Sequence, residues 1–309
     1  MKLLHSALLA ATLPLAIIAP VAPAYQANAQ EAAQADEAVQ HDHIRTRLYG
    51  TAGPVVVLIP GMSTPAAAWD DTVASLVDDH RVLTVEVRGF AGERGTANES
   101  AGAIDGIVAD ISADLAARNL GSATIVGHSL GGLIAMEFGL AHAEQAKSLV
   151  ILDSLPFFGM VFAPDMTLEK VEPQAKQMRD MMIAGAEQMR AAGLANTTSG
   201  AGAAGMSIDE ATRARIANWS LDAEPLAVAE LVYEDTMTDL RSEIASLKMP
   251  VTVVHMANGG YREMAIERYT TDYAALPGVR LVPVDNSLHF VQLDQPEIVR
   301  AEIRAAAAK

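Results

Sequence analysis

Ser129 is the residue whose surroundings point most directly to covalent chemistry. It stands in the pattern Gly127-x-Ser129-x-Gly131, after the apolar run 123–126 and before a stretch with helical character. A serine hydroxyl is a poor nucleophile unless it is activated, and a sharp strand-to-helix turn is one way to expose it. Such a turn strains the backbone, so the residues two positions either side must be small. The pattern therefore predicts a nucleophilic serine on a tight turn.

Strand and helix patterns alternate along the chain on both sides of this turn. Apolar runs predict strands, and apolar residues three and four positions apart predict helices. Alternation in units of roughly 25 to 35 residues indicates the α/β class, with a mostly parallel sheet and helices on both faces. The predicted strands are residues 43–49, 54–59, 81–87, 123–126, 147–152, 251–255 and 279–284, and the predicted helices are residues 104–120, 129–142, 262–276 and 296–308.

Residues 156–245 interrupt this alternation, because their helical segments follow one another without a convincing strand. We expect them to form a helical cap inserted between two parts of one core, residues 44–155 and 246–309. Within the cap, residues 173–192 predict a helix that Pro173 starts, and Ser207 to Glu210 form a capping box that opens another.

Residues 193–205, between these helices, are rich in Gly, Ala, Thr and Ser and predict a flexible connection. Two sets of apolar side chains in the cap leave two interpretations open, packing within the cap or a wall of an adaptable apolar pocket. The two sets are Met178, Met182 and Met189, which recur on one helical face, and Phe157, Phe158 and Phe162, which follow the strand at 147–152.

Residues 1–29 have the pattern of an export signal. After a basic start, residues 8–19 are apolar, and a small-x-small cleavage pattern ends at Ala29. The apolar run is too short for a hydrocarbon core of about 30 Å and contains Pro14, so we expect no stable membrane anchor. We therefore predict a periplasmic or secreted protein whose mature chain starts with a flexible leader, residues 30–43.

The net charge, the absence of cysteine and the positions of the histidines set expectations about partners, disulfides and metal sites. The chain has 22 Lys and Arg against 38 Asp and Glu, a formal net charge of −16, which disfavours binding to nucleic acid and anionic lipid. It has no cysteine, so an exported protein of this sequence must rely on core packing in place of disulfides. No metal site is expected, because His41 and His43 lie in the predicted leader without a third ligand nearby.

Four segments resemble the α/β-hydrolase superfamily, in particular serine esterases and lipases with a helical cap. They occur in the family's order, and the resemblance covers nearly everything from about residue 44 onward. In the first, Pro60 replaces a usual His, and in the second Glu86 occupies the acidic place. The four segments are residues 56–62 (VVLIPGM), 85–90 (VEVRGF), 127–132 (GHSLGG) and 286–296 (NSLHFVQLDQP).

The resemblance implies the roles of four residues. Ser129 would be the nucleophile and His289 the base, while the backbone amides of Met62 and Leu130 would stabilise the oxyanion. Acyl transfer needs all of these groups, together with a third side chain that orients the imidazole.

The identity of that third side chain is less direct. The family usually places an acid after the strand that is here 251–254, but residues 255–260 contain no carboxylate. Some members carry the acid one strand earlier, and Asp153 stands at that point. We assign Asp153, with Asn258 and Glu263 as the alternatives.

These residues predict an exported serine hydrolase that cleaves a small carboxylic ester with an apolar part through an acyl-enzyme, without a metal or organic cofactor. The same triad serves thioesterases, amidases, carbon–carbon bond hydrolases, acyltransferases and haloperoxidases, so the reaction subtype stays open. The alternative of a different class is a non-catalytic member of the fold that binds an apolar ligand or a protein partner.

Overall fold

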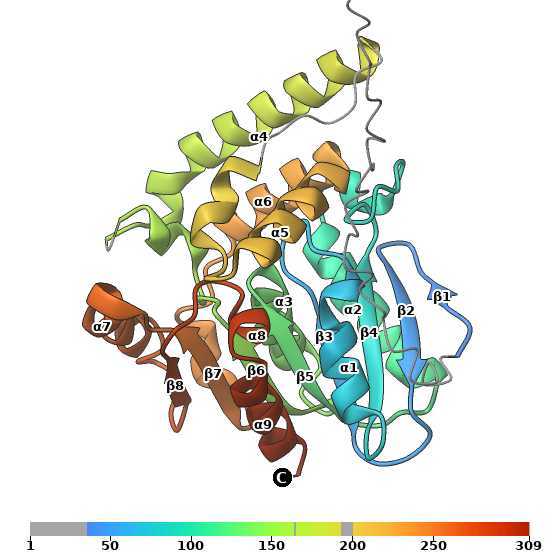
Figure 1. Ribbon diagram of the computed structural model, residues 1–309. Helices are drawn as coiled ribbons and strands as arrows, with labels where there is room; N and C mark the ends of the chain where they lie inside the picture. The colour runs from blue at the N-terminus through green and yellow to red at the C-terminus, as the bar shows by residue number, and fades with distance from the viewer. Residues whose placement is uncertain (1–35, 164, 193–199, 309) are drawn as a thin grey trace, which may run out of the picture. The chain divides into compact units, whose positions relative to one another are not determined.

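An eight-stranded sheet forms the centre of the protein (Figure 1). The computed structural model describes residues 36–163, 165–192 and 200–308. Strands β3 to β8 run parallel to one another, whereas β2 pairs antiparallel with both β4 and β1 at one edge. The predicted mostly parallel sheet is confirmed. In spatial order the strands are β1 (Val39–Gln40), β2 (Ile44–Tyr49), β4 (Arg81–Val87), β3 (Val55–Ile59), β5 (Ala123–His128), β6 (Ala146–Leu152), β7 (Val251–Met256) and β8 (Arg280–Val284).

The central strands are buried on both faces, which explains their continuous apolar sequences. Every residue of β3 and β5 is buried. In the register of the sheet, Ile59 pairs with Gly127 and His128 pairs with Leu152. The carboxyl ends of β3, β5 and β6 therefore meet at one edge of the sheet, where the segments that follow them lie close together.

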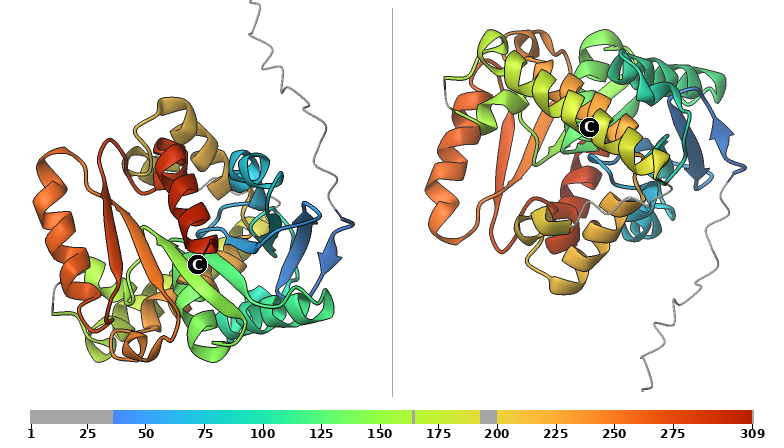
Figure 2. Two further views of the ribbon diagram at one scale, coloured as in Figure 1. Left: turned by 90° about the horizontal axis from the view of Figure 1, so that it is seen from below. Right: turned by 90° about the horizontal axis from the view of Figure 1, so that it is seen from above.

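Helices cover both faces of the sheet, as the alternation predicted (Figure 2). On one face, Val73 and Ile303 pack in the same apolar cluster as Val56 of β3. On the other face, Ile107 packs in a second cluster with Val57. The first face carries α1 (Asp70–Leu76) and α9 (Pro296–Ala307), and the second carries α2 (Ala103–Ala117), α3 (Leu130–Ala141) and α7 (Arg262–Asp272); the short α8 (Val291–Asp294) precedes α9.

The segment between β6 and β7 forms the predicted helical cap (Figure 1). It contains α4 (Leu168–Ala191), α5 (Glu210–Asp222) and α6 (Pro225–Met237). Helix α4 packs against α6. Because the insertion leaves the sheet at the carboxyl end of β6, it starts at the same edge as the predicted nucleophile turn.

Two helix starts in the cap differ from the prediction. Helix α4 begins at Leu168, where the Thr167 side chain accepts a hydrogen bond from the Lys170 amide, so Pro173 lies inside the helix. Helix α5 is capped by Asp209, which accepts from the Thr212 amide at 2.7 Å, and the predicted capping box does not form. Of the predicted connection, residues 200–205 form a short 3-10 helix, and residues 193–199 lie outside the described residues.

The expected leader, residues 30–43, ends earlier than the sequence indicated. Strand β1 pairs with β2, and the Asp36 amide donates to the Leu48 carbonyl at 2.9 Å. These are backbone hydrogen bonds along an edge strand, which a polar sequence without periodicity does not reveal. The predicted export signal, residues 1–29, lies outside the described residues. Within the part of the chain that the structure describes, no helix combines the length and apolar character needed to cross a membrane.

Candidate active site

Ser129 occupies a strained turn between β5 and α3. Its backbone angles are φ 53° and ψ −124°, a combination that a residue with a side chain rarely adopts. Such a conformation costs on the order of 1–3 kcal/mol and persists only where the surrounding structure holds it. Here the Ser129 amide donates to the Leu152 carbonyl at 2.9 Å, and the Gly132 amide donates to the Ser129 carbonyl at 2.7 Å. Strand β6 and helix α3 together fix the turn.

The glycines around Ser129 are required by close backbone contacts. A Cβ atom on Gly127 would lie 1.9 Å from the Gly131 carbonyl oxygen. A Cβ atom on Gly131 would lie 2.5 Å from the carbonyl oxygens of Ile59 and Pro60. Neither position can hold a larger residue without displacing backbone, which is the physical reason for the spacing that the sequence displays.

His289 and Asp153 form a hydrogen-bonded pair although 136 positions separate them in the sequence. The imidazole Nδ1 donates to Asp153 Oδ2 at 2.8 Å. Asp153 directly follows β6 and is 7% exposed in its side chain, whereas the His289 side chain is 29% exposed. Because Nδ1 is engaged by the carboxylate, Nε2 is the nitrogen that remains available as a proton acceptor.

The second oxygen of Asp153 has two donors of its own. Oδ1 accepts from the Met256 amide at 2.9 Å and from the Tyr269 hydroxyl at 3.0 Å. Burial alone raises the pKa of a carboxyl group, but the hydrogen bond and charge of His289 and the Met256 amide outweigh it and lower the pKa of Asp153 below 3.8. Asp153 is therefore ionised at neutral pH. Sequence reasoning missed Tyr269, for which the pair of tyrosines at 269 and 273 on a predicted helix was the available signal.

The two alternative partners for His289 lie elsewhere. Asn258 precedes the turn at 259–261, and Glu263 is exposed in the first turn of α7. Among the described residues, neither side chain makes a hydrogen bond or ion pair with His289. Of the three candidates, only Asp153 contacts the imidazole.

His128 links the serine turn to the loop that carries His289. Its ring is fully buried, its Nε2 donates to the His289 carbonyl at 3.0 Å, and the two ring centroids lie 4.7 Å apart. Burial and the neighbouring His289 lower the pKa of His128 to about 3, so its ring is uncharged at neutral pH. Because Ser129 follows His128 directly, this contact holds the His289 loop beside the serine turn.

The Ser129 hydroxyl makes no hydrogen bond with His289 within the described part of the chain. Hydrogen bonds of this kind are often long without substrate and shorten in the reacting complex. The structure thus brings the segments of the two residues together and leaves the last contact between their side chains unmade.

The two predicted oxyanion amides lie at the same edge of the sheet. Leu130 is the first residue of α3, and Met62 follows Gly61 in the turn after β3. A Cβ atom on Gly61 would lie 3.1 Å from the Ser129 Cβ, so this turn closely approaches the serine. Among the described residues, neither amide donates to another protein group, and both are therefore available to an oxygen atom of a ligand.

The loop that carries His289 is attached to the cap. Asp294 accepts hydrogen bonds from the Leu288 amide of this loop at 2.8 Å and from the Ser207 hydroxyl of the cap at 2.5 Å. The Phe290 amide donates to the Met206 carbonyl at 2.8 Å. Sequence reasoning placed Asp294 in a family segment without this role, because hydrogen bonds between distant segments leave no local pattern.

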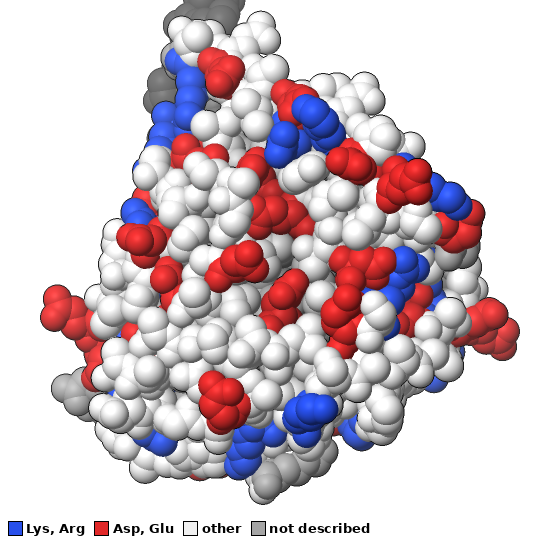
Figure 3. Space-filling model, turned by 180° about the vertical axis from the view of Figure 1, so that it is seen from behind, with Lys and Arg blue, Asp and Glu red and all other residues white. Residues whose placement is uncertain are grey.

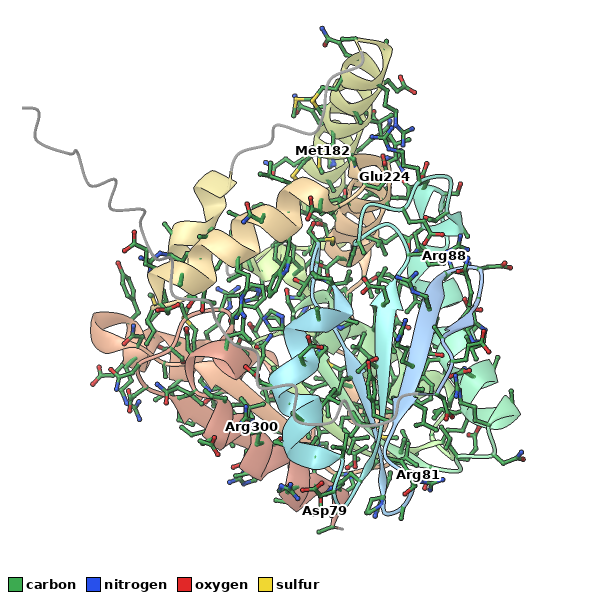
Figure 4. The ribbon with its side chains drawn as sticks, turned by 45° about the vertical axis from the view of Figure 1, so that its right-hand side comes forward. Asp79, Arg81, Arg88, Met182, Glu224 and Arg300 are labelled. Carbon is green, nitrogen blue, oxygen red and sulfur yellow. The ribbon has the colours of Figure 1, made fainter. Side chains whose placement is uncertain are left out.

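The apolar side chains that the sequence analysis singles out in the cap differ in burial. Phe157 is fully buried with Met160 and Val171, whereas Phe162 is 50% exposed. The three methionines on α4 are half-buried along the helix, and Met182 is labelled in Figure 4. The packing interpretation therefore holds for Phe157. In the described residues, no group of three His, Asp or Glu side chains is arranged to hold a metal ion.

The described site can be compared with known proteins by sequence. The chain is 31% identical over 106 residues to a pimeloyl-[acyl-carrier protein] methyl ester esterase of Aeromonas hydrophila, which covers 34% of this chain and 40% of that protein. The aligned parts thus span about two fifths of the first such esterases. A karrikin insensitive 2 receptor of Petunia hybrida is 24% identical over 264 residues, 82% of this chain and 91% of the receptor.

Solved structures give the same fold. A thermophilic esterase from Thermogutta terrifontis superposes with a TM-score of 0.68 at 20% identity, covering 87% of this chain and 97% of the esterase. The enol-lactonase from Burkholderia xenovorans gives a TM-score of 0.64 at 18% identity, with 86% and 96% covered. The model of the alpha/beta hydrolase family matches residues 56–302, a range that holds every residue of the site described above. The chain therefore belongs to the alpha/beta hydrolase family.

Proposed function

We propose that the protein is a serine hydrolase that cleaves small carboxylic esters with an apolar part, through a Ser129-His289-Asp153 triad. The observation that carries this proposal is the strained turn of Ser129 beside a His289–Asp153 pair that leaves Nε2 free. Membership of a hydrolase family and similarity to proteins named as esterases support it. Thioester, amide and carbon–carbon bond cleavage use the same groups and remain variants of this proposal.

The reaction would proceed in two acyl transfers. Ser129 Oγ attacks the ester carbonyl while His289 Nε2 takes the hydroxyl proton, and the amides of Met62 and Leu130 bind the oxyanion. The carbon–oxygen bond to the alcohol then breaks, and the imidazolium gives its proton to the leaving alkoxide. Water, deprotonated by His289, attacks the acyl-enzyme, and the acid leaves as Ser129 regains its proton.

Labelling with a fluorophosphonate tests this function directly. We expect one adduct per chain on Ser129, no adduct in Ser129→Ala, and hydrolysis of p-nitrophenyl esters by the unmodified protein. Release rates over a series of acyl lengths then define the apolar part. An intact, folded protein that neither labels nor hydrolyses any ester would contradict the proposal.

A second candidate is a ligand-binding member of the family. The similarity to a named receptor over 82% of the chain favours it, as does the unmade contact between Ser129 and His289. A non-catalytic member would bind an apolar ligand and form no fluorophosphonate adduct, so the labelling experiment separates the two candidates. We further propose that the protein is exported, on the pattern of residues 1–29.

A further inference from the structure

Asp235 differs from the neighbouring acidic side chains of α6 in having no hydrogen-bonding or ionic partner within the described part of the chain. Glu230 lies 3.6 Å from the Arg179 guanidinium. Glu234 accepts hydrogen bonds from the backbone amides at the start of α2, at 2.6–3.0 Å. Among the described residues, the half-buried Asp235 carboxyl makes no hydrogen bond or ion pair. A carboxylate withdrawn from water without a partner is unfavourable, so the fold alone gives no reason for this residue.

The position of Asp235 relates it to the candidate active site. Leu231, one turn earlier on the same face of α6, is fully buried in the apolar cluster that contains Leu130 and against which Met62 packs. This face of α6 is therefore turned toward the serine side of the sheet. The charge of His289 lowers the pKa of Asp235, which agrees with this placement.

The Asp235 carboxyl is half-buried on α6. Burial raises its pKa to about 7, and the charge of His289 only partly opposes this rise. The side chain is nevertheless partly exposed, as is that of His289. Both side chains therefore keep surface that a ligand can contact.

Asp235 does not serve as the orienting acid of His289. The imidazole Nδ1 is already bound by Asp153 at 2.8 Å, and Asp235 has no hydrogen bond with the ring. A carboxylate offers only acceptor atoms, so what it lacks here is a donor. A hydroxyl or an ammonium group on the substrate would supply that donor.

We propose that Asp235 is a specificity residue that binds a hydroxyl or ammonium group on the substrate, close to the scissile ester bond. This inference rests on the proposed function and narrows its substrate class to esters with such a donor beside the carbonyl, on an otherwise apolar acyl chain. A hydrogen bond to a charged acceptor is worth about 1.5–3 kcal/mol, which corresponds to roughly 10- to 100-fold in kcat/KM.

Three methyl esters of one chain length test the proposal, namely methyl butyrate, methyl 3-hydroxybutyrate and methyl 3-aminobutyrate. Acid release is measured at pH 8, where Asp235 is ionised. We expect kcat/KM of the unmodified protein for at least one donor-bearing ester to exceed that for methyl butyrate by roughly 10-fold or more. The hydroxyl and amino arms show which donor is preferred.

Three variants assign the preference to Asp235. Asp235→Leu should abolish it while retaining hydrolysis of methyl butyrate, and Asp235→Asn should abolish the preference for the amine more than that for the hydroxyl, because an amide oxygen still accepts. Asp222→Asn, which removes the same charge from an exposed position in the cap, should change nothing. The melting temperature of Asp235→Leu should be equal to or above that of the unmodified protein, because an unpartnered carboxylate is lost.

The possible results separate the inference from the function beneath it. Hydrolysis of all three esters without preference, or a preference unchanged in Asp235→Leu, overturns the inference and leaves the serine hydrolase intact. A fall in melting temperature with Asp235→Leu would assign a structural role and also overturn it. Absence of any ester hydrolysis, together with absence of fluorophosphonate labelling, overturns both proposals.

Discussion

The Asp153 carboxylate is held by three donors, one of which is the imidazole that it orients. Two of them, the Met256 amide and the Tyr269 hydroxyl, bind Oδ1 and leave Oδ2 for His289. The carboxylate is thus fixed before the reaction begins, and its charge is available to stabilise the imidazolium that forms. Asp153→Asn removes the negative charge of this side chain, whereas Tyr269→Phe removes only one of the groups that hold it in position.

We expect Asp153→Asn to lower kcat by roughly 1,000- to 10,000-fold, because an amide favours the wrong tautomer and cannot stabilise the imidazolium. Tyr269→Phe removes one neutral hydrogen bond and keeps the charge, so we expect a loss of only about 5-fold. Steady-state ester hydrolysis measures both, with circular dichroism as a control for folding. Near-normal turnover of Asp153→Asn would assign the acid to another residue.

Glu86 predicts a dependence of stability on pH. Its Oε2 accepts from the Ala66 amide at 2.8 Å, whereas its buried Oε1 has no partner among the described residues. Burial raises the pKa of Glu86 from 4.5 to about 7. Between these two values the folded state holds a proton that the unfolded state releases, so the free energy of unfolding falls as pH rises from 4.5 to 7.

Glu86→Gln removes this titration and keeps an oxygen for Ala66. We therefore expect the variant and the unmodified protein to unfold alike at pH 4, and the variant to be more stable at pH 8 by up to about 3 kcal/mol. Urea unfolding at the two pH values measures the difference. Parallel stability curves across pH 4–8 would show that Glu86 does not carry the titration.

At the scale of elements, Glu224 connects the cap to the core. Its side chain is 2% exposed and lies 2.5 Å from the Arg190 guanidinium of α4 and 3.1 Å from the Arg94 guanidinium of the loop after β4. It also caps α6 through the Leu226 amide. Figure 4 shows Glu224 below α4, between the cap and the strands. One carboxylate thereby joins three segments.

We expect Glu224→Ala to reduce the free energy of unfolding by about 2 kcal/mol, less than a fully buried pair would lose because both arginines retain access to water. Amide hydrogen exchange in α4 should accelerate, because the end of this helix loses the ion pair between Arg190 and Glu224. The matched control is Lys176→Ala, which breaks an exposed ion pair with Asp180 on the same helix and should cost less than about 0.5 kcal/mol. Equal effects of both substitutions would contradict this role.

The sequence predicted the elements of the core better than those of the cap. Strands such as β3 and β5 are buried on both faces. Their sequences are therefore continuously apolar, and such runs predict buried strands directly. Helix α4 begins at Leu168 because Thr167 caps it, and a proline five residues later suggested a start that the structure does not use. The caps of α4 and α5 are Thr167 and Asp209, while Pro173 and Ser207 offer start signals of the same local kind, so the sequence alone does not decide between them.

The residues of the candidate site also differ in how well the sequence predicts them. Ser129 and its glycines could be predicted, because the strained turn requires particular residue types at a fixed spacing. Tyr269 and Asp235 could not be predicted, because the site residue that each interacts with lies more than 50 positions away in the sequence. Contacts of this kind are set by the fold and leave no periodicity in the sequence.

At the scale of the whole molecule, acidic side chains dominate. The formal net charge is −16, and Asp and Glu side chains are spread over the face shown in Figure 3. An excess of negative charge keeps copies of the chain apart in solution and repels other anions. It fits the proposal that the protein works outside the cytoplasm on small substrates.

We expect the full-length chain to be processed after Ala29 in a bacterial host. Mass spectrometry of the periplasmic or culture fraction should find a chain that starts at Gln30, with unchanged esterase activity. Replacing Ala27 and Ala29 with bulky residues should block cleavage, because signal peptidase sites need small side chains there. A full-length chain confined to the cytosol would contradict the proposed export.

Placing the acid at the end of β6 has a consequence for protein engineering. The turn after β7, residues 257–261, carries no group of the proposed triad, and Gly259, Gly260 and Tyr261 are exposed. The hydrogen bonds between β7 and Asp153 involve Val254 and Met256, both within the strand and before this turn. This turn is therefore a suitable point at which to graft an affinity tag or a fused domain without disturbing hydrolysis.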